Sequence, residues 1–169
     1  EERTLGYNIP LYKSSPVNVY MTPEEAEKLE ASVKLKIQYT KDGKLTVKAE
    51  YKLNEEEQTL EHSFDKLPAV LSTPVGILGF TVNDAILNDT IRPIEENIYL
   101  VGYIASPTIV AENYSENLNV EPASKTTTIA LMSLQSTIKQ RGIDFINRLI
   151  AFYNQDTNDE KNEVAQKSA

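Results

Sequence analysis

The chain contains neither cysteine nor tryptophan, and it has a single histidine among its 169 residues. Without cysteine there is no disulfide framework, no thiolate ligand for a metal and no thiol nucleophile. The one histidine, His62, has no second histidine or tight carboxylate cluster at ligand spacing, which argues against zinc. His62 lies in a segment where apolar and polar residues alternate, and a lone histidine in such a strand is typically a packed or edge residue. We therefore expect no catalytic residue, no metal ligand and no cofactor-binding residue in this chain.

Glycine is scarce, and long apolar runs are absent. The six glycines form neither the phosphate-binding loop nor the dinucleotide-binding pattern, and no serine lies in a GxSxG nucleophile elbow. No run reaches the roughly 18 apolar residues that a membrane-spanning helix needs, and no signal-peptide pattern occurs. Both absences fit a segment that lies between two membrane anchors of a longer protein.

The composition is that of an acidic globular chain. Apolar residues make up 40% and charged residues 25% of the sequence, which indicates a folded rather than a disordered chain. The net charge of −8 argues against nucleic acid or an anionic membrane surface as the main partner. The length predicts one domain over residues 1–169, large enough to bury a core.

The clearest local pattern is a β-hairpin. Apolar and polar residues alternate from Val33 to Tyr39 and again from Leu45 to Leu53, on either side of the turn residues Asp42 and Gly43. Alternation around Asp-Gly predicts two antiparallel strands with one buried and one solvated face. The alternation continues from Leu60 to Phe64 as a third strand. The lysines on the outer face are interpreted as solvated surface, with binding as a minor alternative.

Other elements follow from caps and short apolar runs. Thr22, Pro23 and Glu25 form a capping box that predicts a helix as far as about Ala31. Ser106 and Pro107 begin a second helix in the same way. Further strands are predicted at Val17–Met21, Ile77–Val82 and, as a central strand, Ile98–Ile104. The remaining segments are interpreted as irregular or loop: residues 1–15, 67–76 and 83–95.

The last third of the chain predicts a strand followed by a long helix. Residues 126–135 favour a strand, and a capping box of Thr137 and Gln140 begins a helix over 137–169. Gly142 costs this helix about 1 kcal/mol relative to alanine, which indicates close packing against the sheet. The helix has an apolar face as far as Tyr153 and is almost wholly polar from Asn154 onward. We expect it to continue beyond the chain, toward a partner outside it.

These elements predict an α+β fold. Its mainly antiparallel sheet has helices packed on one face, and the β-hairpin region and the long C-terminal helix complete it.

Three segments resemble a known family. The run from Ser124 to Thr157 reads SKTTTIALMSLQSTIKQRGIDFINRLIAFYNQDT. It is similar to the place where the last strand of the base domain enters the long helix in polysaccharide co-polymerases, the chain-length determinants of the Wzz/Wzc type. Residues 67–82, with Leu67-Pro68-Ala69 and Thr73-Pro74-Val75-Gly76, resemble a loop and strand in the tyrosine-autokinase branch. The strand start at Ser15-Pro16-Val17 fits the segment after the first membrane helix. Residues 32–66 are less typical and are interpreted as a β insertion.

The resemblance implies a place in the cell and a role. This chain would be a periplasmic base domain of an inner-membrane protein that controls the length and export of capsular polysaccharide or exopolysaccharide. Its partners would be copies of itself in a ring, the inner membrane through flanking helices, and the polymerase and export machinery. In the autokinase branch a cytoplasmic domain carries the ATP-dependent tyrosine kinase. None of the kinase motifs occurs here, so no catalytic residue is carried over.

Two other functions stay open at this point. An extracytoplasmic carbohydrate- or peptide-binding module is the first, and exposed aromatic side chains beside the hairpin would favour it. A hydrolase is the second, and it requires a convergent carboxylate pair in a cleft. The chain has no tryptophan, and only 8% of its residues are aromatic.

Overall fold

The computed structural model describes residues 2–4, 7–87 and 97–167 and has an α+β fold. Length alone predicts one domain over residues 1–169, whereas the structure divides into two compact units, residues 1–113 and residues 114–169. The strands of the first unit pair among themselves, and the two strands of the second unit pair with each other. Each unit is therefore described by itself.

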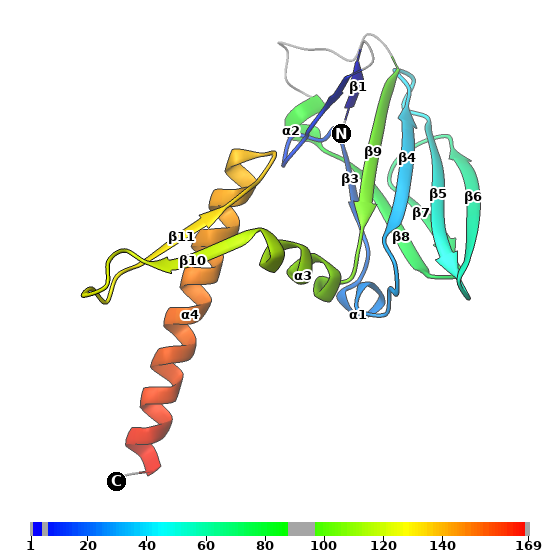
Figure 1. The fold of residues 1–169 in the computed structure, drawn as a ribbon. Coiled ribbons are helices and arrows are strands. Elements are labelled where there is room, and N and C mark those ends of the chain that lie inside the picture. Colours follow the sequence, from blue (N-terminus) through cyan, green and yellow to red (C-terminus); the bar gives the residue numbers. More distant parts are fainter. Residues whose placement is uncertain (1, 5–6, 88–96, 168–169) are drawn as a thin grey trace. The chain divides into compact units, whose positions relative to one another are not determined.

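A six-stranded antiparallel sheet forms one layer of the first unit (Figure 1). Its strands follow the order β2-β1-β9-β4-β5-β6. Their bounds are β2 (Tyr7–Ile9), β1 (Glu2–Thr4), β9 (Ile98–Ile104), β4 (Val33–Tyr39), β5 (Leu45–Leu53) and β6 (Glu56–Phe64). The predicted hairpin is confirmed, with Tyr39 opposite Leu45 across the turn. Gly43 adopts a φ of 84° in that turn, a left-handed conformation that glycine reaches without strain.

A three-stranded antiparallel sheet forms the second layer. It consists of β3 (Val17–Tyr20), β8 (Gly76–Val82) and β7 (Ala69–Thr73), with β8 in the middle. The two sheets enclose one hydrophobic core, in which Leu35 and Leu45 of the first sheet and Leu78 and Phe80 of the second are at most 1% exposed. Each such side chain contributes about 1.5–3 kcal/mol by burial.

This core corrects one expectation about the layers of the fold. A second sheet, and not a layer of helices, covers the buried face of the six-stranded sheet, because the alternating apolar residues of β7 and β8 supply the facing side chains. Residues 32–66, interpreted above as a β insertion, contain β4, β5 and β6 and supply much of the buried core.

The helices of the first unit are short. α1 (Pro23–Ala26) begins as predicted, since the Thr22 side chain accepts a hydrogen bond from the backbone N–H of Glu25. It ends before the predicted Ala31. The Thr22 hydroxyl donates to Oε2 of Glu25, and Oε1 of Glu25 accepts from the backbone N–H of Ile77 in β8. The capping glutamate therefore also attaches this turn to the second sheet.

Three segments that the sequence predicts as irregular or loop contain regular structure. β1 and β2 lie in residues 1–15 and pair with each other. β7 occupies part of the predicted loop at 67–76, between Pro68 and Pro74. α2 (Asp84–Leu87) occupies the start of the predicted loop at 83–95. Residues 88–95 of that loop lie outside the described residues. Each of these elements has at most five residues, too few for a periodicity to stand out.

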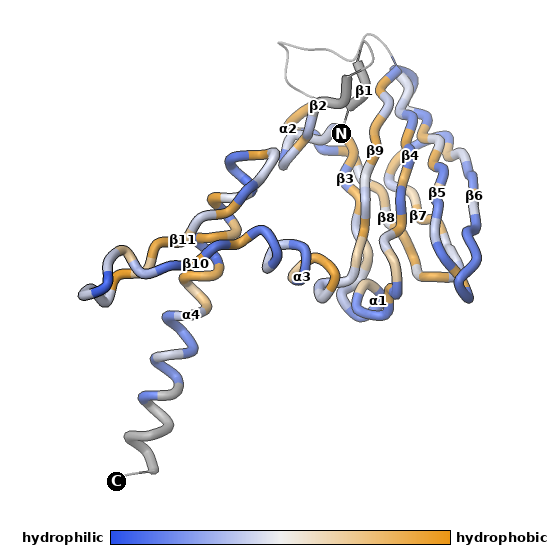
Figure 2. Tube along the Cα trace, in the orientation of Figure 1, coloured by the Kyte–Doolittle hydropathy of each residue, from blue (hydrophilic) through white to orange (hydrophobic). Residues whose placement is uncertain are grey.

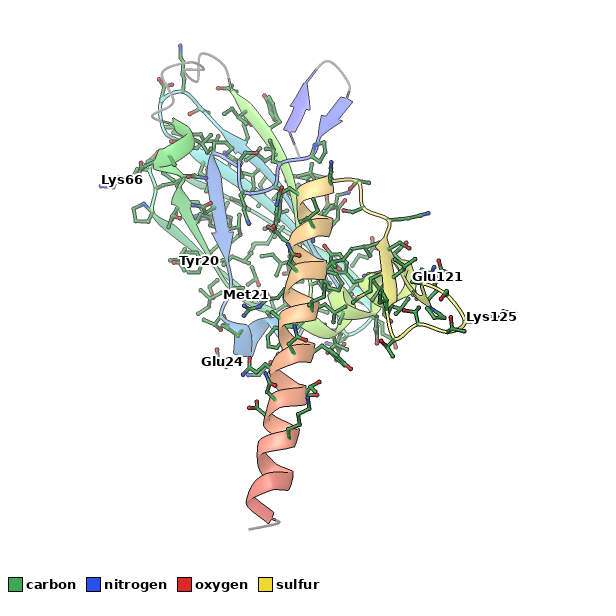
Figure 3. All side chains as sticks on the ribbon, turned by 90° about the vertical axis from the view of Figure 1, so that its left-hand side faces the viewer. Tyr20, Met21, Glu24, Lys66, Glu121 and Lys125 are labelled. Carbon is green, nitrogen blue, oxygen red and sulfur yellow. The ribbon has the colours of Figure 1, made fainter. Side chains whose placement is uncertain are left out.

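The second unit combines the end of one helix, a hairpin and a long helix. α3 (Pro107–Asn117) crosses from the first unit and begins at the predicted cap, where the Ser106 hydroxyl accepts from the N–H of Ile109. β10 (Leu118–Pro122) and β11 (Ala130–Leu134) form an antiparallel pair, and α4 (Lys139–Lys167) follows. Figure 3 labels Glu121 and Lys125 on this hairpin and the connection that follows β10.

Candidate interaction surface

His62 lies exposed on the edge strand β6, and its ring packs against that of Phe64, with 4.6 Å between the ring centroids. This agrees with its interpretation as an edge residue. Among the described residues, no group of three histidine, aspartate or glutamate side chains is arranged to hold a metal ion.

The first unit has a recess of about 360 Å³ beside α1. Glu25 and Glu30 both line it, together with Lys28, Tyr51 and Asn54. Glu25 already accepts hydrogen bonds from Thr22 and from the backbone of β8, so its carboxylate serves to attach α1. This recess therefore offers no free carboxylate pair of the kind that a glycoside hydrolase uses.

The lysine-rich outer face of the six-stranded sheet is solvent-exposed, as predicted. Lys36 donates a hydrogen bond to Oε1 of Glu50 on the next strand, and Lys34 lies 3.9 Å from Oε2 of the same carboxylate. The hydrogen bond from Lys36 is the main cause that lowers the pKa of Glu50. Desolvation opposes it, and the positive charges of Lys36, Lys34 and Lys48 lower the pKa further, so that the net shift is downward.

The second unit contains one well-packed aromatic pair. The rings of Tyr114 in α3 and Phe145 in α4 are stacked, with 4.1 Å between centroids, and the guanidinium of Arg141 lies 5.8 Å from the Tyr114 centroid. Gly142, near the start of α4, is buried. A Cβ atom there would lie 3.1 Å from Cβ of Ser136 and 3.8 Å from Leu134 at the end of β11. The predicted close packing of Gly142 is thus against the strand and turn that precede α4.

The start of α4 differs in detail from the prediction. The hydroxyl of Ser136 accepts from the N–H of Ile138 and donates to its carbonyl. The side-chain amide of Gln140 donates forward to Asp144, 2.8 Å away, and not back to the predicted cap at Thr137. The helix therefore begins at Lys139, two residues after the predicted cap.

The strand predicted at 126–135 is shorter than expected. Only Ala130–Leu134 forms a strand, and its partner β10 was not predicted as one. The N–H of Ala123 donates to the carbonyl of Ile129 across the connection. The apolar residue Val120 between polar neighbours was the available signal for β10, but a single such residue is too weak to define a strand.

Apolar side chains of the second unit are exposed. Burial is described for residues 114–159 and 161 of the second unit, and among these only Gly142 is buried. The exposed large apolar residues are Val120, Ile129, Leu131 and Met132 on and beside the hairpin, and Ile143, Ile150, Phe152 and Tyr153 on α4. We call this set the apolar surface of the second unit. Figure 2 shows that α4 carries its hydrophobic residues in its first half and that the coloured residues after them are hydrophilic.

The spacing of apolar residues on α4 is that of a helix-packing seam. Ile143, Ile146, Ile150 and Tyr153 are separated by three, four and three residues. This is the a/d pattern by which one α-helix packs lengthwise on another. The next two positions of the same pattern, Thr157 and Glu160, are polar, so the seam covers about two heptads.

No helix of the described residues combines the length and hydropathy of a membrane span. The sequence matches no protein-family model, and comparisons with characterised proteins and with solved structures also give no match.

Proposed function

We propose that this chain is a non-catalytic assembly domain whose second unit binds a partner protein. The observation that carries this proposal is the apolar surface of the second unit: a long helix and a hairpin that expose large apolar side chains and bury almost none. A two-stranded hairpin and a helix of this kind are marginally stable by themselves. Exposed contiguous apolar area on a folded protein is typical of a contact surface.

The occupant of this surface is a helix of a second copy of the chain. The a/d spacing on α4 favours a helical partner, because a hairpin or loop would not interdigitate with residues three and four apart. The guanidinium of Arg148 lies 4.8 Å from the ring centroid of Phe152, which places a positive charge beside the seam. Such a polar border around an apolar centre is typical of protein–protein interfaces.

The resemblance to the Wzz/Wzc type supplies the biological setting of the proposal. In that setting the chain is the periplasmic base domain of an inner-membrane polysaccharide co-polymerase, held by flanking membrane helices. α4 continues into a longer helix, and ring-shaped homo-oligomers control the chain length and export of capsular polysaccharide or exopolysaccharide. An autokinase domain, where the parent protein has one, lies in the cytoplasm and outside this chain.

Two experiments test the proposal. The first is to sequence the reading frame on both sides of this chain. Apolar spans of about 20 residues on each side are expected; a signal peptide without a second span would contradict the membrane setting.

The second experiment compares the intact protein with its Ile150→Asp variant by mass photometry in detergent. Ile150 is 38% exposed, so part of its side chain is open to a partner. The change removes that seam packing, and the oligomer should dissociate. Asn158→Asp adds the same charge outside the seam and should leave the oligomer intact. An unchanged oligomer in the Ile150→Asp variant would contradict the assembly role of α4.

A further inference from the structure

Two tyrosines of β9 face solvent on the outer side of the six-stranded sheet. Leu100 of this strand is 5% exposed and belongs to the core, whereas Tyr99 is 50% exposed and Tyr103 is 62% exposed. Because side chains alternate along a strand, both tyrosines lie on the face opposite the core. They are four residues apart, about 13 Å along the strand at roughly 3.3 Å per residue. That distance corresponds to a short oligosaccharide and exceeds one sugar ring.

The neighbouring strand β4 supplies polar side chains in register with these rings. Tyr103 is paired with Lys34, and Tyr99 is paired with Gln38. The side-chain amide of Gln38 lies within hydrogen-bonding distance of the Tyr99 hydroxyl, at 3.3 Å. Lys36, between them, pairs with Val101 on β9. Each ring is therefore bordered by a side chain that can bind hydroxyl or carboxylate oxygens.

The same face is locally positive on an acidic chain. The outward positions of β4 and β5 carry Lys34, Lys36, Lys48 and Lys52 against one carboxylate, Glu50. Lys36 and Lys48 are directly opposite each other in the β4–β5 register, an arrangement of like charges that destabilises a sheet unless an anion lies beside it. Glu50 supplies part of that negative charge. Glu57 and Glu61 lie on β6, opposite Lys52 and Lys48, farther from the tyrosines.

We infer that this outer face over β9, β4 and β5 binds an acidic glycan strand. The C–H face of a sugar ring is apolar and stacks on an exposed aromatic ring. The hydroxyls of the sugar suit the side chains of Gln38 and the tyrosines, and the carboxylates of uronic acids suit the lysines. A protein partner fits less well, because the centres of protein interfaces are depleted in charged residues, whereas the Lys36–Glu50 ion pair lies within this face.

This inference goes beyond the proposed assembly role and does not depend on it. The glycan face lies in the first unit, on β9, β4 and β5, and the assembly surface lies in the second unit, on α4 and the hairpin. Loss of one activity by substitution leaves the other to be measured, so the two proposals fail separately.

The test is a titration of the 169-residue chain, monitored by NMR amide shifts, with three probes. These are a galacturonic acid hexamer, a glucose hexamer and poly-glutamate. We expect saturable binding of the galacturonic acid hexamer with shifts confined to β9, β4 and β5, at least tenfold weaker binding of the glucose hexamer, and no competition by poly-glutamate. Binding should weaken with added salt, because exposed charges are screened.

Substitutions locate the site. Tyr99→Thr with Tyr103→Thr keeps β-propensity high and should weaken binding of the galacturonic acid hexamer at least tenfold. The matched control is Tyr20→Thr, since Tyr20 is also an exposed strand tyrosine, at 54% exposure, but on β3 of the other sheet; it should leave binding unchanged. Equal binding of the glucose hexamer, effective competition by poly-glutamate, no effect of the double substitution, or no saturable binding would each overturn the inference.

Discussion

Two adjacent residues of β8 offer a sharp test of the two-sheet core. Leu78 is fully buried, whereas its neighbour Ile77 is 50% exposed on the opposite face of the strand. The side chains are isomers, so Leu78→Ala and Ile77→Ala remove the same atoms. The first substitution should cost about 2–5 kcal/mol, because it removes buried contacts and leaves a cavity. The second should cost about 1 kcal/mol, because the half-exposed side chain of Ile77 gains only about half of the 1.5–3 kcal/mol that full burial of such a side chain contributes. Solvent also fills the space that this truncation leaves.

The free energy of unfolding should be measured by urea titration, followed by the ellipticity of the sheets. The midpoint should fall much more for Leu78→Ala than for Ile77→Ala, with similar m-values, since m reports the surface exposed on unfolding. A one-residue shift of register would exchange the faces of the two side chains. Equal losses, or a larger loss for Ile77→Ala, would therefore refute the sandwich as described.

Three further predictions test other parts of the structure. The pKa of Glu50 is lowered below its ordinary 4.5, so the stabilising contribution of its carboxylate is present above pH 4.5 and is lost as the pH falls through the folded-state pKa. In urea titrations, the Glu50→Gln variant should therefore be less stable than wild type at pH 7 and equally stable at low pH. A stability difference that stays constant with pH would contradict this. Gly142→Val should lower the midpoint of thermal unfolding, because a Cβ atom at residue 142 would lie 3.1 Å from Cβ of Ser136. Gly102→Ala should change this midpoint little, because the space around the added atom is open. Similar effects of the two substitutions would argue against the close packing of α4. The isolated 169-residue chain should be monomeric or weakly associated at micromolar concentration in light scattering, since the proposed anchors and continued helix are absent, and a stable ring would refute that.

The hairpin of β4 and β5 could be predicted from sequence because two signals agree there. The alternation of apolar and polar residues and the turn of Asp42 and Gly43 specify the same register. β7 gave no such agreement. Its five residues alternate between buried and exposed positions, but prolines at 68 and 74 flank them, and prolines beside a short run favour a loop. Pairing with β8 along its whole length makes it a strand, and such long-range pairing is not encoded in the local sequence.

The second unit shows the same limit for a longer element. Residues 126–135 are predicted as one strand, yet only Ala130–Leu134 is a strand, because β10 offers five partner residues and no more. The extent of a strand is set by its partner. The helix α4 was predictable for the opposite reason, since its hydrogen bonds are local and its apolar spacing needs no knowledge of the partner.

The proposed glycan face could not be predicted because its exposure depends on which face of the six-stranded sheet the second sheet covers. The apolar run of β9 favours a central strand buried on both faces, and β9 does lie between β1 and β4. The second sheet covers only the face that carries Leu100, however, and Tyr99 and Tyr103 are left on the other. Period-two alternation says that two faces differ; it does not say which face another layer will cover. The same strand thus stabilises the fold through Leu100 and presents aromatic rings to solvent, at no cost to the core. Selection for binding could therefore change the outer residues of β9 and β4 while leaving the buried register intact.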